Sequence, residues 1–219
     1  MYYFDIQYII RNLPLLLKGL VLTVEVSLAT IVLSSLLALS LVFLRISKNK
    51  LLSGTMYYYI QAARNTPTLI KIYMAYFGLP TIGIMFDPVI AGLTALVFDH
   101  TAYIIEIYRG GIESISKGQI EAAEGVGFRH WQVIRLVILP QAFRHALPSL
   151  ANHFILCVKD SSLLSIIAVM ELTMVGNLMM EKSGNSYEVF AITALIYLVI
   201  ISTMCLLFRF WEKEIKFNF

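Results

Sequence analysis

Residues 118–140 read GQIEAAEGVGFRHWQVIRLVILP, a charged and glycine-punctuated segment between long apolar stretches. Its pattern predicts a first helix over 119–124 and a second that runs from 128 toward Pro140, where the proline stops it. Gly125 and Gly127 separate the two helices, because glycine is a poor helix former. An apolar stripe on each helix is typical either of a surface helix lying on lipid or of a knob that fits a groove on a partner.

The whole chain is too apolar for a water-soluble domain. Of its 219 residues, 58% are hydrophobic and 14% are charged, and the mean hydropathy is +0.76. A helix needs about 20 mostly apolar residues to cross a bilayer. We therefore predict an all-α integral membrane protein with a single transmembrane domain over residues 1–219, a long loop over 110–145, and five spans at 14–44, 54–79, 86–108, 146–170 and 187–209.

Lys and Arg residues collect on one side of these predicted spans. Eleven lie in the first connection, the third connection or the C-terminal segment, and three lie on the other side. Because basic loops stay in the cytoplasm, we expect the N-terminus outside and both segment 118–140 and the C-terminus inside. The larger set is Arg45, Lys48, Lys50, Arg109, Lys117, Arg129, Arg135, Arg144, Arg209, Lys213 and Lys216, and the smaller set is Arg11, Lys18 and Lys182.

Three predicted spans carry polar residues near their middles: 64–67 in the second, 99–100 in the third and 159–162 in the fourth. Charges at the bilayer centre are costly unless they pair or face a cavity. Because the three polar groups lie at matching depths, they favour a shared binding or permeation site. The alternative is a structural kink with salt bridges that lock the helices together. Pro67 predicts a break in its helix, which leaves the carbonyl of Ala63 in need of a polar neighbour.

The mixture of charges in these groups suits a zwitterion. Arg64 and Lys159 offer cations for a carboxylate, and the aspartates of the other groups offer anions for an ammonium group. Glu106 is a further anion, although a pair with Arg109 three residues along the same helix explains it equally well. The candidate substrate-binding residues are Arg64, Thr66, Asp99, Glu106, Lys159, Asp160 and Ser162.

Metal, redox and nucleic-acid chemistry find no support in the sequence. Cys157 and Cys205 lie inside predicted spans, where packing explains them better than a disulfide or a metal site. His130, His145 and His153 lack the spacing of metal ligands, so we expect no metal. The net charge of +3 restates the excess of Lys and Arg on one side and indicates no nucleic-acid partner.

A longer spaced pattern runs through the opening segment. Glu121-Ala122-Ala123 is followed after three residues by Gly127, and then by Val137 and Leu139-Pro140. This resembles the EAA loop of ABC-importer permeases, with Val137 where isoleucine is usual. The resemblance to the polar amino-acid branch (histidine, glutamine, arginine and glutamate type) covers about residues 13–210 and includes Arg64-Asn65-Thr66-Pro67, Tyr76-Phe77-Gly78-Leu79-Pro80, Ala102-Tyr103, Glu106, Arg109-Gly110-Gly111-Ile112, Gly118-Gln119, Leu139-Pro140-Gln141-Ala142, Leu147-Pro148, Asn152 and Lys159-Asp160-Ser161-Ser162-Leu163.

This resemblance implies a five-helix bundle of the type I importer class, with a cytoplasmic coupling-helix loop. The chain is then the translocation subunit of an ATP-driven amino-acid importer in the bacterial cytoplasmic (inner) membrane. The implied partners are cytoplasmic ABC ATPase subunits, a second permease subunit in a homo- or heterodimer, an external solute-binding protein, a polar amino acid and membrane lipid. The implied ATPase-coupling residues are Glu121, Ala122, Ala123, Gly125, Gly127, Phe128, Leu139 and Pro140.

The chain has no Gly-Lys pair, so the phosphate-binding loop G-x-x-x-x-G-K-[ST] is absent. We expect a non-catalytic subunit that binds no cofactor, with ATP and Mg²⁺ used by the partner ATPase. Two alternatives are an ion-coupled secondary amino-acid transporter and a non-transporting membrane sensor or scaffold. The small chain without a detectable inverted repeat argues against the first, and costly midplane charges argue against the second.

The sequence departs from the family pattern at three places. Gln61 stands where glutamate is frequent, residues 68–71 read TLIK in place of a more usual Leu-Leu-Val-Gln, and Asp99-His100 replaces small or apolar residues. These departures leave the class intact and bear on the substrate. Asp99 and His100 either tune a pocket for a particular side chain or pair with Lys71 or with a partner subunit.

Overall fold

The computed structural model describes residues 6–184 and 186–217, and all regular elements within these ranges are helical. The other residues of the predicted domain 1–219 lie outside the described ranges. The predicted all-α class is confirmed. The elements are α1 (Ile6–Arg45), α2 (Lys50–Asn65), α3 (Thr68–Tyr73), the π turn η1 (Met74–Gly78), the 3₁₀ turn η2 (Leu79–Ile82), α4 (Pro88–Glu113), α5 (Lys117–Gly125), α6 (His130–Gln132), the π turn η3 (Val133–Ile138), α7 (Leu139–Asp160), the 3₁₀ stretch η4 (Ser161–Ile167), α8 (Leu172–Ser183) and α9 (Ser186–Phe217).

The span predicted at 54–79 is not one helix in the structure but is divided among α2, α3, η1 and the first residue of η2. Thr66 and Pro67 have extended backbones, with ψ of 133° and 137°, because a proline disfavours helix at the residue before it. The break expected at Pro67 is therefore confirmed. In the described ranges, four helical stretches are long and apolar enough to cross a membrane: Gln7–Arg45, Pro88–Glu113, His130–Ile167 and Tyr187–Lys213.

The third of these stretches passes through Pro140, so the prediction that the helix stops there is wrong. The π turn η3 precedes the proline, and the Leu139 N–H donates to the carbonyl of Ile134, five residues back. Pro140 then stands in the first turn of α7, where a missing N–H costs little. The wider π turn allows one continuous helix to accommodate the proline.

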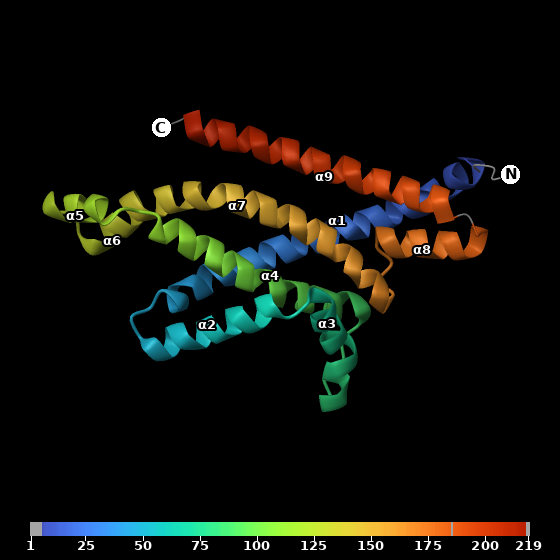
Figure 1. The fold of residues 1–219 in the computed structure, drawn as a ribbon, viewed down its shortest axis with the longest axis horizontal. Helices are drawn as coiled ribbons and strands as arrows, with labels where there is room; N and C mark the ends of the chain where they lie inside the picture. Colours follow the sequence, from blue (N-terminus) through green and yellow to red (C-terminus); the bar gives the residue numbers. More distant parts are fainter. Residues whose placement is uncertain (1–5, 185, 218–219) are drawn as a thin grey trace.

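The helices α1, α4, α7 and α9 run along the long axis of the molecule (Figure 1). α4 packs against both α1 and α7. The turn between α1 and α2, the pair α5 and α6, and the end of α9 lie at one end of the molecule, and the start of α1 lies at the other (Figure 1). The three segments that carry the excess of Lys and Arg therefore share one end.

Two hydrophobic clusters pack around different parts of α4. One contains Leu96 together with Ile167 of η4, and the other contains Ile104 together with Leu150 of α7. The intervening turn carries residues 99–100, an aspartate and a histidine that are both buried. This polar layer lies between two apolar layers, so its groups must find partners inside the protein.

α4 and α7 approach closely at Gly111. A Cβ atom on this glycine would lie 2.6 Å from the carbonyl oxygen of Ala142 and 3.2 Å from the side chain of Ala146. Small residues let helix backbones come together in this way. The close approach places side chains of α4 within reach of those of α7.

Buried and partly buried hydrogen bonds join α8 to α1 and α9. The Glu171 carboxylate accepts from the N–H groups of Thr173 at 2.9 Å and Met174 at 2.7 Å, and from the Tyr197 hydroxyl at 2.9 Å. The Leu172 N–H donates to the Thr23 hydroxyl at 3.0 Å. These contacts satisfy N–H groups that the start of a helix leaves free.

Candidate functional site

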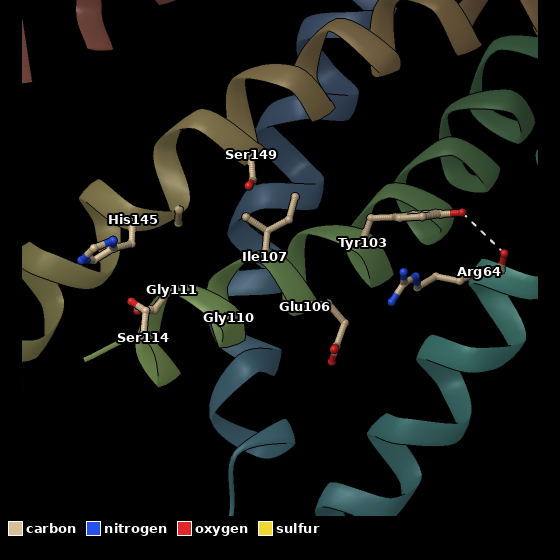
Figure 2. Close-up of a pocket in the computed structure, with 10 residues that line it drawn as sticks. Arg64, Tyr103, Glu106, Ile107, Gly110, Gly111, Ser114, His145 and Ser149 are labelled. Carbon is tan, nitrogen blue, oxygen red and sulfur yellow. Dashed lines mark hydrogen bonds between the residues drawn. The ribbon is translucent and has the colours of Figure 1, made fainter. Parts of the chain in front are cut away.

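A pocket of about 460 Å³ opens between α2, α4 and α7 (Figure 2). On α4, side chains that recur every three or four residues share one face of the helix. That face is met by two polar residues of α7, which lie four residues apart. The pocket is lined by Arg64, Tyr103, Glu106, Ile107, Gly110, Gly111, Ser114, His145, Ala146 and Ser149.

Arg64 reaches from the last turn of α2 toward the ring of Tyr103 on α4 (Figure 2). Its guanidinium carbon lies 5.3 Å from the ring centroid, within the range of a cation–π contact. The Tyr103 hydroxyl faces the Arg64 carbonyl at 3.5 Å. Among the described residues, no carboxylate lies within ion-pair distance of this arginine, so its charge is available to an anionic group.

Glu106 lines the same pocket, but arginines already engage its carboxylate. Arg109 donates to it from Nε at 3.0 Å and from a terminal nitrogen at 2.7 Å, and Arg45 of α1 donates at 3.2 Å. The pairing with Arg109 is the helix-face alternative that the sequence left open. Glu106 therefore ties α1 to α4 at the rim of the pocket.

Asp99 lies in the polar layer, where its side chain is only 2% exposed. It accepts a hydrogen bond from the Thr68 hydroxyl at 2.6 Å and forms an ion pair with Lys71. Of the alternatives left open, this chain pairs Asp99 with Lys71. Thr68, Lys71 and Asp99 are all departures from the family pattern, and the structure joins them in one hydrogen-bonded unit.

Lys71 has a second partner, which explains its position. Its ammonium donates to the carbonyl oxygen of Ala63 at 2.6 Å. This is the carbonyl that Pro67 deprives of its helical partner, and the need for a polar neighbour is thereby confirmed. The lysine thus supports the broken end of α2 and balances the charge of Asp99.

The remaining predicted residues lie elsewhere. Lys159 and Ser162 line a second pocket of about 350 Å³, together with Thr173 and Tyr197. A carboxylate oxygen of Asp160 lies 3.7 Å from Nε2 of His100 in the polar layer. Thr66 forms the C-terminal cap of α2 and lines neither pocket. Within this one chain, the predicted residues other than Thr66 are divided between two pockets and the polar layer rather than sharing one cavity.

Sequence reasoning missed Tyr103, His145 and Ser149 as pocket residues. The signal was present in their spacing, because Tyr103 and Glu106 share one face of α4, and His145 and Ser149 share one face of α7. Finding them required knowing that these two faces meet.

A terminal knob, residues 117–130, stands at one end of the molecule (Figure 1). α5 ends in a Schellman motif: the N–H of Gly127 donates to the Glu124 carbonyl at 2.9 Å, and that of Phe128 donates to the Ala123 carbonyl at 3.1 Å. Gly127 has φ of +87°, which only glycine adopts without cost. The side chain of Val126, the C-cap of α5, is exposed.

A comparison with protein families matches residues 30–216 to the family described as binding-protein-dependent transport system inner membrane component. The chain belongs to this family. As such a component it is a multi-pass inner-membrane protein, in agreement with its long apolar helices. The resemblance to ABC-importer permeases is confirmed.

Relatives of this inner-membrane component match nearly its whole length. The probable amino-acid ABC transporter permease protein YckA of Bacillus subtilis (strain 168) is 36% identical over 213 residues, covering 97% of this chain and 94% of the relative. The glutamine transport system permease protein GlnP of Escherichia coli (strain K12) is 32% identical over 215 residues, covering 97% and 98%.

The fold is also that of a solved permease. A chain from the crystal structure of an amino acid ABC transporter with histidines superposes with a TM-score of 0.92 at 30% identity. The match covers 97% of this chain and 100% of the other. The broken helix at Pro67 and the terminal knob therefore belong to an architecture that occurs in a transporter.

Proposed function

We propose that this permease subunit forms the pathway by which an ATP-driven importer carries a polar amino acid across the membrane. The observation that carries the proposal is the likeness over almost the full length to permeases named for amino acids, including the glutamine permease GlnP. The cations and anions near the polar layer support it, since a zwitterion needs both.

The ATPase docks on the terminal knob in this proposal. Val126 on the knob and Trp131, which directly follows it, leave 76% and 55% of their surfaces exposed. Exposed apolar side chains on a short helical segment and its cap suit a groove on a partner. ATP and Mg²⁺ belong to that ATPase, and this chain contributes no catalytic group. Closure of two ATPase subunits then moves the knob and, through α7, the transmembrane helices.

The knob faces the cytoplasm, with the C-terminus on the same side and the N-terminus outside. Support comes from the grouping of the α1–α2 turn, the knob and the end of α9 at one end of the molecule (Figure 1). Basic segments of this kind remain on the cytoplasmic side.

In the pathway, Arg64 binds the carboxylate of the amino acid, since its charge is not neutralised and Tyr103 holds its guanidinium in place. Lys159, Asp160 and Ser162 form a second group of substrate contacts, and Thr66 lies near the first. Asp99 and Glu106 act indirectly, as counter-ions that fix Lys71 and Arg109. A second permease subunit, identical or different, completes the pathway, and an external solute-binding protein delivers the amino acid.

The test is uptake into vesicles that contain the chain assembled with its ATPase and receive the solute-binding protein on the outside. We expect uptake of labelled glutamine, arginine, histidine or glutamate to require ATP and to resist ionophores. Uptake that persists without the ATPase and is abolished by an ionophore would instead establish an ion-coupled transporter. Absence of flux for all four amino acids, with ATP hydrolysis intact, would refute the proposed substrate class.

A further inference from the structure

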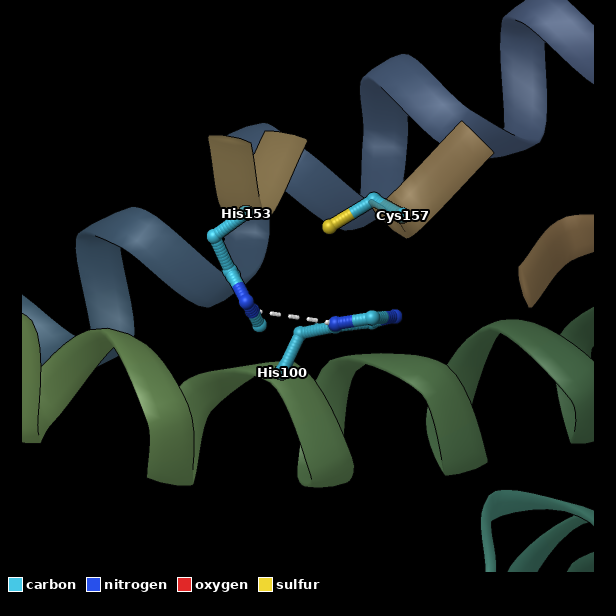
Figure 3. A group of neighbouring side chains, drawn as sticks. All are labelled: His100, His153 and Cys157. Carbon is cyan, nitrogen blue, oxygen red and sulfur yellow. Dashed lines mark hydrogen bonds between the residues drawn. The ribbon is translucent and has the colours of Figure 1, made fainter. Parts of the chain in front are cut away.

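Three potential metal ligands converge in the polar layer between α4 and α7 (Figure 3). His100 comes from α4, and His153 and Cys157 come from α7. Their exposed fractions are 1%, 7% and 0%. The expectation of no metal rested on the spacing of the histidines and on packing as the role of Cys157. Neither argument can reveal a ligand set divided between two helices.

The geometry of the three donor atoms approaches that of a metal site. Nδ1 of His100 lies 3.1 Å from Nε2 of His153, and the ligand atoms of all three residues lie within 4.8 Å of one another. A tetrahedral zinc ion, with bonds of about 2.0 Å to nitrogen and about 2.3 Å to sulfur, separates its ligands by roughly 3.5 Å. Small side-chain rotations therefore suffice to close the site.

The arrangement on α7 supports the same conclusion. His153 and Cys157 are four residues apart, which places both on one face of the helix toward α4. A pair of ligands at this spacing on one helix, completed by a ligand from elsewhere, is a common way to hold zinc. Three protein ligands leave a fourth position for a small ligand such as water.

Asp160 supplies the outer contact that metal-bound histidines require. Its carboxylate oxygen lies 3.7 Å from Nε2 of His100, and that nitrogen is buried without a hydrogen-bond partner. A metal-bound histidine normally directs its other nitrogen at a carboxylate, which fixes the ring. A hydrogen bond between the two imidazoles accounts for their 3.1 Å contact, but it leaves both the orphaned nitrogen and the adjacent thiol unexplained.

Charge and ligand type select the ion. A thiolate with two imidazoles is a soft donor set that favours zinc over magnesium or calcium, which prefer oxygen. One Zn²⁺, one thiolate and the neighbouring Asp160 carboxylate sum to zero charge, as a buried site requires. We propose that His100, His153 and Cys157 bind a zinc ion that joins α4 to α7.

The test uses the purified, reduced complex of permease and ATPase, with ZnSO₄ and CoCl₂ as probes. We expect one high-affinity zinc per permease chain and, on Co²⁺ substitution, a thiolate-to-cobalt charge-transfer band. Cys157→Ser abolishes that band, and His100→Gln weakens zinc binding at least 10-fold. Asp160→Asn weakens it by about 10- to 100-fold, as is usual for an outer-shell partner.

Matched controls are Cys205→Ser and His130→Gln, which change the same residue types away from the cluster. They retain the zinc and the cobalt band, and any zinc bound by the ATPase is common to all samples. Wild-type complex that shows no charge-transfer band refutes the proposal without any mutant. The proposal is also refuted if the Cys157→Ser variant elutes as an assembled complex and binds zinc with the affinity of the wild type.

Discussion

Replacing Gly127 by alanine tests whether the capped end of α5 transmits the ATP cycle. Gly127 has φ of +87°, and no atom lies within 4 Å of the position a Cβ would take. The effect of Gly127→Ala is therefore conformational rather than steric. A left-handed backbone costs an L-residue about 1–2 kcal/mol, which shifts the ratio of capped to frayed α5 by roughly 5- to 30-fold.

Two companion substitutions isolate this conformational cost. Gly118→Ala makes the same chemical change within α5, where φ is not positive and no atom lies within 4 Å, so it should leave the cap intact. Gly127→Asn tests the backbone requirement directly, because asparagine tolerates the left-handed region better than alanine does. We expect the damage to follow the order alanine, asparagine, glycine.

The assay is amino-acid uptake per ATP hydrolysed in vesicles, together with hydrogen exchange of the amides of Gly127 and Phe128. Gly127→Ala should lower the uptake per ATP several-fold and speed exchange of both amides. Normal uptake per ATP in a variant whose amides exchange faster would show that the cap does not carry coupling. Unchanged exchange in Gly127→Ala would refute the conformational argument itself.

Three further substitutions address the helix packing and the pathway. Gly111→Ala places a Cβ 2.6 Å from the Ala142 carbonyl oxygen and should destabilise the α4–α7 contact by about 1–3 kcal/mol, measured by thermal unfolding in detergent. The control Gly110→Ala meets no atom within 4 Å and should leave the stability unchanged. Equal losses of stability in the two variants would contradict the close approach of the helices. Lys71→Met leaves Asp99 as an uncompensated buried charge and should lower the free energy of unfolding by about 3–5 kcal/mol. The double variant, which also carries Asp99→Leu, should regain most of this stability. Additive losses in the double variant would show that the two side chains are not coupled. Lys159→Ala or Asp160→Ala should abolish uptake while the complex still assembles and hydrolyses ATP, and normal uptake in both variants would remove these residues from the pathway.

Composition and motif spacing were sufficient to predict most of the fold. Apolar runs of membrane-spanning length predicted an all-α membrane protein, and Pro67 correctly marked the interruption in 54–79. The pattern from Glu121 to Pro140 predicted the family. These signals are local or compositional, so a single sequence carries them.

The continuation of the helix through Pro140 was not predictable from local rules. A proline usually ends a helix, and only the π turn over Val133–Ile138 lets this helix continue. Whether a helix widens in this way depends on tertiary packing, which local propensity does not encode. The corresponding span was therefore predicted to begin at 146, whereas the third long helix begins at His130.

Contacts between helices were the other information that the sequence did not provide. The need of the Ala63 carbonyl for a donor followed from Pro67, but its satisfaction by Lys71 depends on how α3 folds back. Likewise, the convergence of His100 with His153 and Cys157 depends on how α4 is rotated against α7. Residue types and their depths are readable from one sequence, whereas the rotation of each helix about its axis is not.

The π turn between α6 and α7 has a consequence for the direction in which the knob faces. A π turn holds one residue more than an α-helical turn needs. Because the wider turn takes up this extra residue, α-helical bonding over the same residues Val133–Ile138 would turn α5 and α6 by about 100° about the axis of α7. The helical form of this turn therefore sets which way the knob points, and a shift from π to α bonding would rotate the knob while α7 stays intact.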